Sequence, residues 1–368
     1  MIRLIDVTYY THLEYDTPEQ ILHHHKESLG YIHYLKDRMQ VQVIKHLNYE
    51  GVLEIDGTKI SFLKSRNKFF HIPLKTHRYI KSQNPDIMIV QGLVFPVQLI
   101  FLKMLLGKQC HFLVQHHGET PFKGVKGLFQ RLADYFIDGY LFTAAGNIHI
   151  WKQRSVIKQG KPDYEVLEAA THMTRQDKAK CQASLGINST DTFLWVGRLE
   201  GNKDPITVLL GFEKYAKENP STCLYMIYQE TDLLAEVQSL IKGSHILSAT
   251  VHLVGKVTKE ELPTWFSAAD FYLSGSHKEA AGFALIESMT CGCIPIVTDI
   301  PPFRKITNGY GLLYSPGNAD DLYAALKKTK EISKENVSAA ITRYAQQKLS
   351  FKSIAEDIYK IARDITRK

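Results

Sequence analysis

Short apolar runs alternate with helical patterns along the second half of the chain. The runs typical of buried strands lie at 192–198, 223–228, 251–256, 270–276, 294–299 and 311–314. Helical spacing of apolar residues follows most of them, as at 205–218 and 231–241, whereas 294–299 leads into a short loop. Strands that alternate with helices predict an α/β domain with a parallel sheet covered on both faces.

The first half shows a weaker version of the same pattern. Strands are predicted at 86–92, 109–118 and 139–146, a buried helix at 96–107, and a hairpin over 49–65 with its turn at Asp56-Gly57. We therefore expect two domains, at 1–165 and 166–350. The last segment, 351–368, reads as a helix with no strand after it, and we expect it to pack back on the first domain.

Composition is that of an ordinary globular protein, with 368 residues, 44% hydrophobic and 23% charged. No apolar run reaches the length of a transmembrane helix, and the N-terminal stretch is polar where a signal peptide is apolar. The five cysteines are scattered and odd in number, which favours a reducing compartment. We expect a cytoplasmic protein, with peripheral contact at the inner face of the membrane left open.

Positive charge is concentrated in the first half. Residues 1–165 hold 21 Lys+Arg against 15 Asp+Glu, a balance of +6 out of the total of +7. Such a domain attracts an anionic membrane or an anionic substrate, and no nucleic-acid motif accompanies the charge. The segment 123–136 places apolar residues at helical spacing among lysines. It reads either as a helix lying on an anionic membrane or as a helix covering the domain core.

Two motifs follow predicted strands of the second domain, where ligands of parallel sheets bind. "GRLEGNKDP" begins at Gly197 and carries two cations, Arg198 and Lys203, which together could neutralise a diphosphate. "HKEAAGFALIE" places Glu279 on a loop and Glu287 inside the helix that follows. The helix N-terminus favours an anion, and carboxylates accept hydrogen bonds from neighbouring hydroxyls of a sugar.

Both motifs, in this order, resemble the retaining family four of GT-B glycosyltransferases, the glycosyl transferases group 1. The resemblance also covers "VGKVTKEELPTWFSAADFYLSGS", "CGCIPIVTDIP" and "GYGLLYSPGNADDLYAAL", so it spans most of residues 192–326. It implies GT-B architecture, with two Rossmann-like parallel-sheet domains facing a cleft. The second domain would bind a nucleotide diphosphate sugar, and the first would bind the acceptor.

The resemblance also implies roles for single residues. Arg198 and Lys203 would hold the donor diphosphate, Glu279 would lie by the transferred sugar, and Glu287 would hold the ribose hydroxyls. Further contacts to the donor are expected from the base-side strand end and the helix start: Val254, Gly255, Lys256, Ala281, Gly282, Phe283 and Ala284. The residues expected to take part in catalysis are His117, Arg198, Lys203 and Glu279.

In the first domain, "QHHGE" ends a predicted strand, and the family commonly has a histidine before Gly or Asp at this place. His117 precedes Gly118 and is the candidate, with His116 as the competing neighbour, since adjacent strand side chains face opposite ways. This chain departs from the family at Ala280 and Ala281, where Gly and an aromatic residue are usual, and it lacks the N-terminal glycine-rich loop.

No metal site is expected. The chain contains no Asp-x-Asp motif, and the three consecutive histidines at 23–25 would splay around a helix. No cofactor is expected other than the donor nucleotide sugar, whose charge the cations and the helix N-terminus would meet.

The sequence thus predicts a metal-independent, retaining glycosyltransferase acting on a carbohydrate or lipid-linked acceptor, in surface polysaccharide or glycoconjugate synthesis. Two alternatives stay open. One is a nucleotide-sugar epimerase on the same architecture, and the other is a catalytically silent nucleotide-binding subunit.

Overall fold

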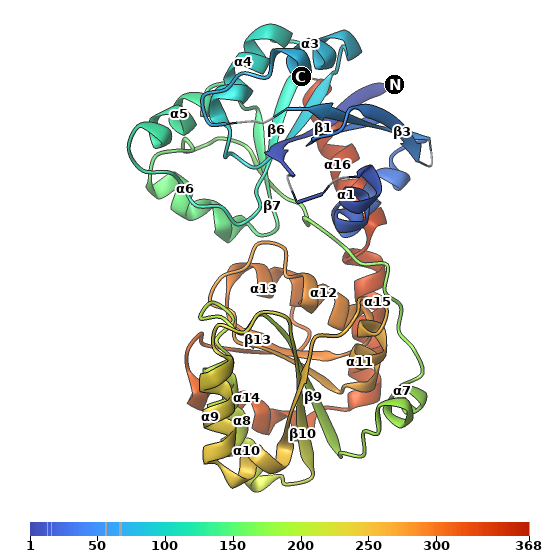
Figure 1. Cartoon of the computed structure of the whole chain (residues 1–368), viewed down its shortest axis with the longest axis vertical. Coiled ribbons are helices and arrows are strands. Elements are labelled where there is room, and N and C mark those ends of the chain that lie inside the picture. The colour runs from blue at the N-terminus through green and yellow to red at the C-terminus, as the bar shows by residue number, and fades with distance from the viewer. Residues whose placement is uncertain (13, 16, 56, 66–67, 368) are drawn as a thin grey trace. The chain divides into compact units, whose positions relative to one another are not determined.

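The computed structural model describes residues 1–12, 14–15, 17–55, 57–65 and 68–367, apart from the side chain of His24. The chain divides into two compact units (Figure 1). Unit 1 consists of Met1–Ala170 together with Ser350–Lys368, and unit 2 is Thr171–Leu349. The boundaries predicted from the sequence fall after residues 165 and 350.

Unit 1 is built on an eight-stranded sheet in the order β3-β4-β2-β1-β5-β6-β7-β8. Its strands are β1 (Ile2–Thr11), β2 (Met39–Leu47), β3 (Gly51–Ile55), β4 (Thr58–Lys64), β5 (Ile87–Gln91), β6 (His111–Gln115), β7 (Gly139–Phe142) and β8 (Asp163–Glu165). All neighbours run parallel except β3 and β4, which pair antiparallel. The predicted hairpin therefore forms, and Asp56 of its turn lies outside the described residues.

Helices cover both faces of this sheet. They are α1 (Pro18–His24), α2 (Lys26–Leu29), η1 (Gly30–Tyr34), α3 (Leu74–Gln83), α4 (Pro96–Leu106), α5 (Gly124–Asp134), η2 (Ala145–Ile148), α6 (His149–Gln153) and α16 (Phe351–Thr366). Side chains alternate along each strand, so Leu4 joins the core shared with α16, whereas Ile5 joins the core shared with α3 and α4. The sheet is thus buried on both sides, as parallel sheets are.

The C-terminal helix α16 belongs to unit 1. Its apolar residues Phe351, Ile354, Ile358 and Ile361 are buried in one cluster with residues of β1, β2 and η1. Ser350 caps its start by accepting a hydrogen bond from the backbone N–H of Ser353. The chain therefore leaves unit 1, builds unit 2, and returns to complete the first core.

Unit 2 contains a six-stranded, fully parallel sheet in the order β11-β10-β9-β12-β13-β14. Its strands are β9 (Asp191–Gly197), β10 (Thr222–Tyr228), β11 (Val251–Gly255), β12 (Phe271–Ser274), β13 (Ile294–Thr298) and β14 (Leu312–Tyr314). The helices are α7 (Lys178–Leu185), α8 (Pro205–Glu218), α9 (Leu234–Gly243), α10 (His245–Thr250), α11 (Leu262–Ala268), α12 (Phe283–Thr290), α13 (Pro301–Thr307), α14 (Ala319–Lys327), η3 (Lys328–Glu331) and α15 (Lys334–Lys348).

These helices form two groups, one on each side of the sheet (Figure 1). Helix α8 contacts α10 and α14, whereas α11 contacts α7 and α12, and α12 contacts α15. The predicted parallel α/β domain is confirmed. A short connection does follow β13, but helix α13, which begins right after it, was not predicted. Pro301 and Pro302 occupy the first turn of this helix, where proline is well tolerated.

Within the part of the chain that the structure describes, no helix is long and apolar enough to cross a membrane.

Two histidines are buried in the core of unit 1. The Nδ1 atom of His46 lies 2.7 Å from the carbonyl oxygen of Thr8, and its Nε2 atom lies 3.0 Å from the hydroxyl of Thr76. His77 lies 2.9 Å from the hydroxyl of Tyr9 through Nε2. Burial lowers the pKa of His46 and that of His77 to about 4. Both rings are therefore neutral in the folded protein at neutral pH.

We expect acid to destabilise unit 1 through these histidines. A histidine with a lowered folded pKa is neutral in both states above pH 6.5, and the unfolded state gains protons first as the pH falls from 6.5 towards 4. The free energy of unfolding should fall by about 2 kcal/mol per histidine between pH 7 and pH 5. Equilibrium urea unfolding at both pH values measures it.

The variant His46→Gln should show a smaller difference between the two pH values, and the exposed His149→Gln serves as the control. A pH dependence that is the same in all three proteins would contradict this account.

Candidate functional site

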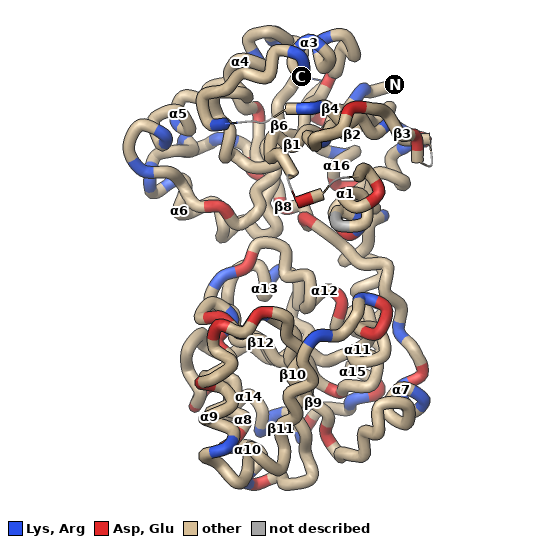
Figure 2. Tube along the Cα trace, in the orientation of Figure 1, with Lys and Arg blue, Asp and Glu red and all other residues tan. Residues whose placement is uncertain are grey.

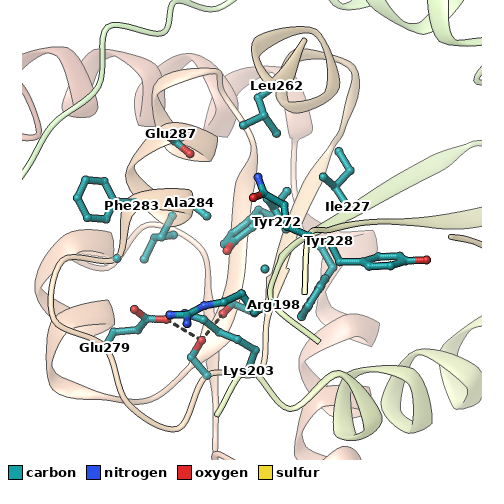
Figure 3. A pocket seen from close by; sticks show the side chains of 18 of the residues that line it. Arg198, Lys203, Ile227, Tyr228, Leu262, Tyr272, Glu279, Phe283, Ala284 and Glu287 are labelled. Atoms are coloured by element: carbon teal, nitrogen blue, oxygen red, sulfur yellow. Dashed lines mark hydrogen bonds and ion pairs between the residues drawn. The ribbon is translucent and has the colours of Figure 1, made fainter. Parts of the chain in front are cut away.

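A pocket of about 460 Å³ lies at the carboxyl edge of the unit 2 sheet (Figure 3). Its walls come from the ends of β9 and β10, the loop after β12, and the first turns of α12. Parallel strands bring their carboxyl ends to the same edge, so residues far apart in sequence meet there. Four lining side chains are charged and were singled out in the sequence: Arg198, Lys203, Glu279 and Glu287.

Two loops of the pocket are tied to each other. Asn202 accepts a hydrogen bond from the backbone N–H of Lys278 at 3.1 Å and donates one to its carbonyl at 3.1 Å. The backbone N–H of His277 donates to the carbonyl of Asn202 at 2.9 Å. A Cβ atom at Gly275 would come within 2.8 Å of the Asp204 carbonyl, so this close approach requires glycine.

Lys203 and Glu279 form an ion pair across these loops. The hydroxyl of Ser276 donates a hydrogen bond to the same carboxylate oxygen at 2.8 Å. The Lys203 side chain is 20% exposed and that of Glu279 16% exposed, so both charges are largely removed from water. An anion entering the pocket would compete with Glu279 for this ammonium group.

Arg198 is more accessible, with a side chain 54% exposed. Its guanidinium lies 3.6 Å from carboxylate oxygens of Glu200 and of Glu230. Ion pairs at this distance and exposure contribute little stability. The fork of Arg198 is therefore free to turn towards an anionic ligand, for which its geometry is well suited.

The start of α12 closes the pocket on another side. Gly282 has φ +65° and precedes the helix, and a Cβ atom there would meet Ile306 at 2.7 Å. The first helical residues, Phe283 and Ala284, line the pocket with Gly282. The N–H groups of a first helical turn have no partner within the helix and favour a negative charge.

The two glutamates reach the same pocket from different elements. Glu279 comes from the loop and lies beside the head groups of Arg198 and Lys203, whereas Glu287 lies farther along α12 (Figure 3). Tyr272 lies in the wall of the same pocket, and burial raises its pKa, with the charges of Glu279 and Glu287 adding to the effect. The arrangement offers a cationic end and a separate carboxylate to one extended ligand.

Four predicted contact residues do not line this pocket. Val254, Gly255 and Lys256 lie outside it, and Val257 lines it instead. The pairing of β10 with β11 shifts register after Leu253, and the chain turns at Gly255 with φ +81°, which changes the residue that faces inward. Ala281 is buried, at 5% exposure, and does not line the pocket either.

The remaining candidate, His117, lies in unit 1 after β6. Its side chain is 34% exposed, and it contacts Glu168 and Gln91. The neighbouring His116 points into the core, between the rings of Phe142 and Trp151 at 4.7 and 5.5 Å. The two histidines face opposite ways, as adjacent residues at a strand end do.

Sequence reasoning missed other residues of the pocket wall. Ser274 and Ser276 stand at the end of β12, and Glu230 follows β10. The rule that ligands bind beyond the carboxyl ends of parallel strands would have selected all three. The apolar wall was also missed because it is distributed over five segments: Ile227, Val257, Leu262, Leu285 and Phe303.

Among the residues that the structure describes, no three His, Cys, Asp or Glu side chains lie together in a way that could hold a metal ion.

Solved structures share this architecture over the whole chain. A glycosyltransferase from Rickettsia africae ESF-5 superposes with a TM-score of 0.74 at 14% identity, covering 100% of this chain and 99% of that one. The Anabaena protein HepE, solved with UDP and glucose, gives a TM-score of 0.68 at 12% identity, with 100% of each chain covered. The chain thus has the GT-B fold of these glycosyltransferases.

Sequence comparison matches unit 2. Residues 177–348 match the family model described as glycosyl transferases group 1. A GDP-mannose:cellobiosyl-diphosphopolyprenol alpha-mannosyltransferase of Xanthomonas oryzae pv. oryzae is 29% identical over 144 residues. That alignment spans 39% of this chain and only 37% of the relative's length. The resemblance seen in the motifs is confirmed.

We expect Lys203→Ala and Arg198→Ala to weaken the binding of a nucleoside diphosphate. A hydrogen bond to a charged group contributes about 1.5–3 kcal/mol, which corresponds to an affinity loss of about 10- to 100-fold. The loss should be larger for Lys203, because it is more buried and its removal leaves Glu279 facing the ligand unpaired. Isothermal titration calorimetry with UDP and with GDP measures both.

Lys259→Ala, which removes an exposed lysine outside the pocket, should bind the nucleotide normally. Unchanged affinity in both pocket variants, with the fold intact by circular dichroism, would show that the diphosphate does not bind at this site.

Proposed function

We propose that the protein is a retaining glycosyltransferase, which moves a sugar from a nucleotide diphosphate sugar to a carbohydrate or lipid-linked acceptor. The observation that carries the proposal is the pocket of unit 2. Arg198, Lys203 and the start of α12 gather positive potential at one place, and Glu287 stands farther along the same helix. A diphosphate needs the first feature and a ribose the second.

In this proposal the diphosphate lies between the two cations and the first turn of α12. Lys203 exchanges its contact with Glu279 for a phosphate oxygen, and Arg198 turns from its two weakly held carboxylates to another. Glu279 is then released towards the transferred sugar, from whose hydroxyls it can accept hydrogen bonds. The Glu287 carboxylate accepts hydrogen bonds from the ribose hydroxyls, and the base occupies the apolar wall near Val257 and Leu262.

The chemical step forms a bond from the acceptor oxygen to the anomeric carbon and breaks the bond from that carbon to the phosphate oxygen. The nucleoside diphosphate leaves with the electron pair, and its phosphate takes the acceptor proton on the same face. Arg198, Lys203 and the α12 N–H groups stabilise the charge that develops on the leaving group. These cations supply the positive charge that a divalent ion supplies elsewhere, so we propose that no metal or other cofactor is needed.

The names of similar proteins support a donor of this kind. The matched Xanthomonas relative is named for GDP-mannose as donor and for a diphosphopolyprenol-linked acceptor, and the Anabaena structure contains UDP and glucose. Both are consistent with a role in polysaccharide or glycoconjugate synthesis. The combination also favours transfer over an epimerase or a silent subunit.

Substituting the two glutamates one at a time should have different effects on binding and on transfer. Glu287→Gln should weaken binding of the nucleoside diphosphate itself, because it loses a charged partner of the ribose. Glu279→Gln should spare that binding and slow sugar transfer by about 10- to 100-fold. The measurement is calorimetry with nucleoside diphosphate, followed by transfer from UDP- and GDP-sugars to lipid-linked and free carbohydrate acceptors, in excess EDTA.

Equal effects of the two variants on both readouts would show that the assigned roles are wrong. Formation of free epimerised sugar in the absence of acceptor would show that the protein is an epimerase and not a transferase. Nucleotide binding without any turnover would support the silent subunit.

We further propose that unit 1 contacts an anionic membrane, at the cytoplasmic face, where a lipid-linked acceptor would be met. Helix α5 buries small and polar residues such as Gly127, Gln130 and Ala133, and it exposes Leu128 and Leu132 to solvent at 62% and 45%. Tyr135, Val125 and, from α4, Met104 are exposed as well. A helix that turns its larger apolar side chains outward is incompletely covered by its own domain.

Basic residues surround this apolar face. Lys123, Lys126 and Arg131 are exposed on or beside α5, and Figure 2 shows basic positions clustered around this helix. An apolar face bordered by cations matches the surface of a bilayer with anionic headgroups. The alternative, a helix that serves only to cover the core, accounts for the buried face of α5 but not for the exposed leucines.

Vesicle sedimentation tests this surface. The protein should bind phosphatidylglycerol vesicles more tightly than phosphatidylcholine vesicles, and the double variant Leu128→Glu/Leu132→Glu should reduce binding by about tenfold or more. Val52→Glu, which changes an exposed apolar residue on β3, is the control. Equal binding of all three proteins, or no binding at all, would rule the surface out.

A further inference from the structure

Unit 1 contains a row of hydrogen-bonded polar side chains that begins at Asp6, inside β1, and reaches the carboxyl edge of the sheet at Glu168. The Nε2 atom of Gln91 lies 2.5 Å from Oδ2 of Asp6, and its Oε1 atom lies 2.6 Å from Nε2 of His117. The other ring nitrogen of His117, Nδ1, contacts Oε1 of Glu168. Four residues from distant parts of the sequence are thereby joined in one line.

The direction of each hydrogen bond in this row can be assigned. The hydroxyl of Tyr31 also donates to Oδ2 of Asp6, at 3.0 Å, so that oxygen is an acceptor. Gln91 directs its amide N–H₂ at Asp6 and its carbonyl at His117. A carbonyl oxygen cannot donate, so Nε2 of His117 carries a proton.

The proton on the other side of the ring is assigned in the same way. The Glu168 carboxylate accepts hydrogen bonds, so Nδ1 of His117 also carries a proton when that carboxylate is ionised. The second oxygen, Oε2, is buried and has no hydrogen-bond partner among the described residues. Glu168 is only 11% exposed, which makes His117 the main group that can compensate its charge.

We propose that Glu168 and Gln91 hold His117 as an imidazolium, with both ring nitrogens protonated, so that Glu168 is a positioning residue for a fixed positive charge. The ring has no lone pair left to accept a proton. His117 therefore serves as a cation and a hydrogen-bond donor in unit 1 and not as a general base.

Other charged groups around the ring shape this balance. Glu119 lies on the same loop and accepts a hydrogen bond from the backbone N–H of His117 at 2.7 Å. Lys45, on β2, is buried and opposes the cation, whereas Asp6, on β1, is buried near both. Burial lowers the pKa of His117, but the charge and hydrogen bond of Glu168, with the charge of Glu119, give a net upward shift. The imidazolium is lost as the pH rises through this raised value.

The consequence for catalysis rests on the proposed function. If His117 serves the acceptor side, as the family resemblance predicts, an imidazolium there cannot take the acceptor proton. That proton is then left to the leaving phosphate. A fixed positive charge with a carboxylate behind it can instead attract an anionic group of a ligand.

Nitrogen NMR of histidine-labelled protein tests the inference without any substrate. The His117 signal is assigned by its loss in His117→Gln. In a pH titration, both ring nitrogens of His117 should show the shifts of protonated nitrogen up to a midpoint above the ordinary histidine value of about 6.5. A midpoint at or below that ordinary value would overturn the inference in the unmodified protein.

Variants then identify the responsible group. Glu168→Gln keeps the shape of the side chain and removes its charge, and it should lower the titration midpoint of His117 by about 1–3 pH units. Glu165→Gln, which changes an exposed carboxylate three residues earlier, should leave the midpoint unchanged. An unchanged midpoint in Glu168→Gln would show that Glu168 does not hold the proton.

Transfer assays separate this inference from the proposed function. Under both proposals, Glu168→Gln lowers the transfer rate at saturating donor, with a loss that grows as the pH rises, and it leaves donor affinity unchanged. If NMR shows a protonated ring but His117→Gln transfers sugar at the full rate, His117 takes no part in the reaction and the imidazolium assignment stands. Normal transfer with a neutral ring would overturn the assignment and leave the proposed function intact.

Discussion

The close approach of two loops at Gly275 is the constraint on which the unit 2 pocket depends. Any side chain there would collide with the backbone of Lys203 and Asp204. Because the loops touch, Asn202 can fix the backbone of Lys278, and Lys203 comes to face Glu279. Because Lys203 and Glu279 lie in a largely buried place, removing their charges from water costs free energy. An anionic ligand offers the Lys203 ammonium group a better partner than Glu279.

The same principle places chemistry in both units. In each parallel sheet the strands end at one edge, and the segments that follow carry polar groups that the sheet interior excludes. In unit 2 this edge collects cations and a helix start. In unit 1 it collects Gln91, His117 and Glu168, which join Asp6 inside β1, and their mutual hydrogen bonds determine the charge of one histidine.

Much of unit 2 could be predicted because its signals are local. Helix α8 begins at Pro205 and ends at Glu218 as predicted, since an apolar period and a capping Asp–Pro pair mark it. Strand β1 was not predicted, because the polar residues Asp6 and Thr8, which belong to a buried network, interrupt its apolar pattern. Glu168 was missed for a related reason: its partner His117 lies 51 residues away, and no local pattern joins them.

The central claim is that the unit 2 pocket binds a nucleoside diphosphate by its cationic end. An experimental structure of the protein with UDP or GDP tests it most directly. The account predicts the diphosphate between Arg198, Lys203 and the backbone N–H of Phe283, the ribose at Glu287, and the Lys203–Glu279 contact broken. A nucleotide bound elsewhere, or one in this pocket with Lys203 still paired to Glu279 and the ribose away from Glu287, would contradict it.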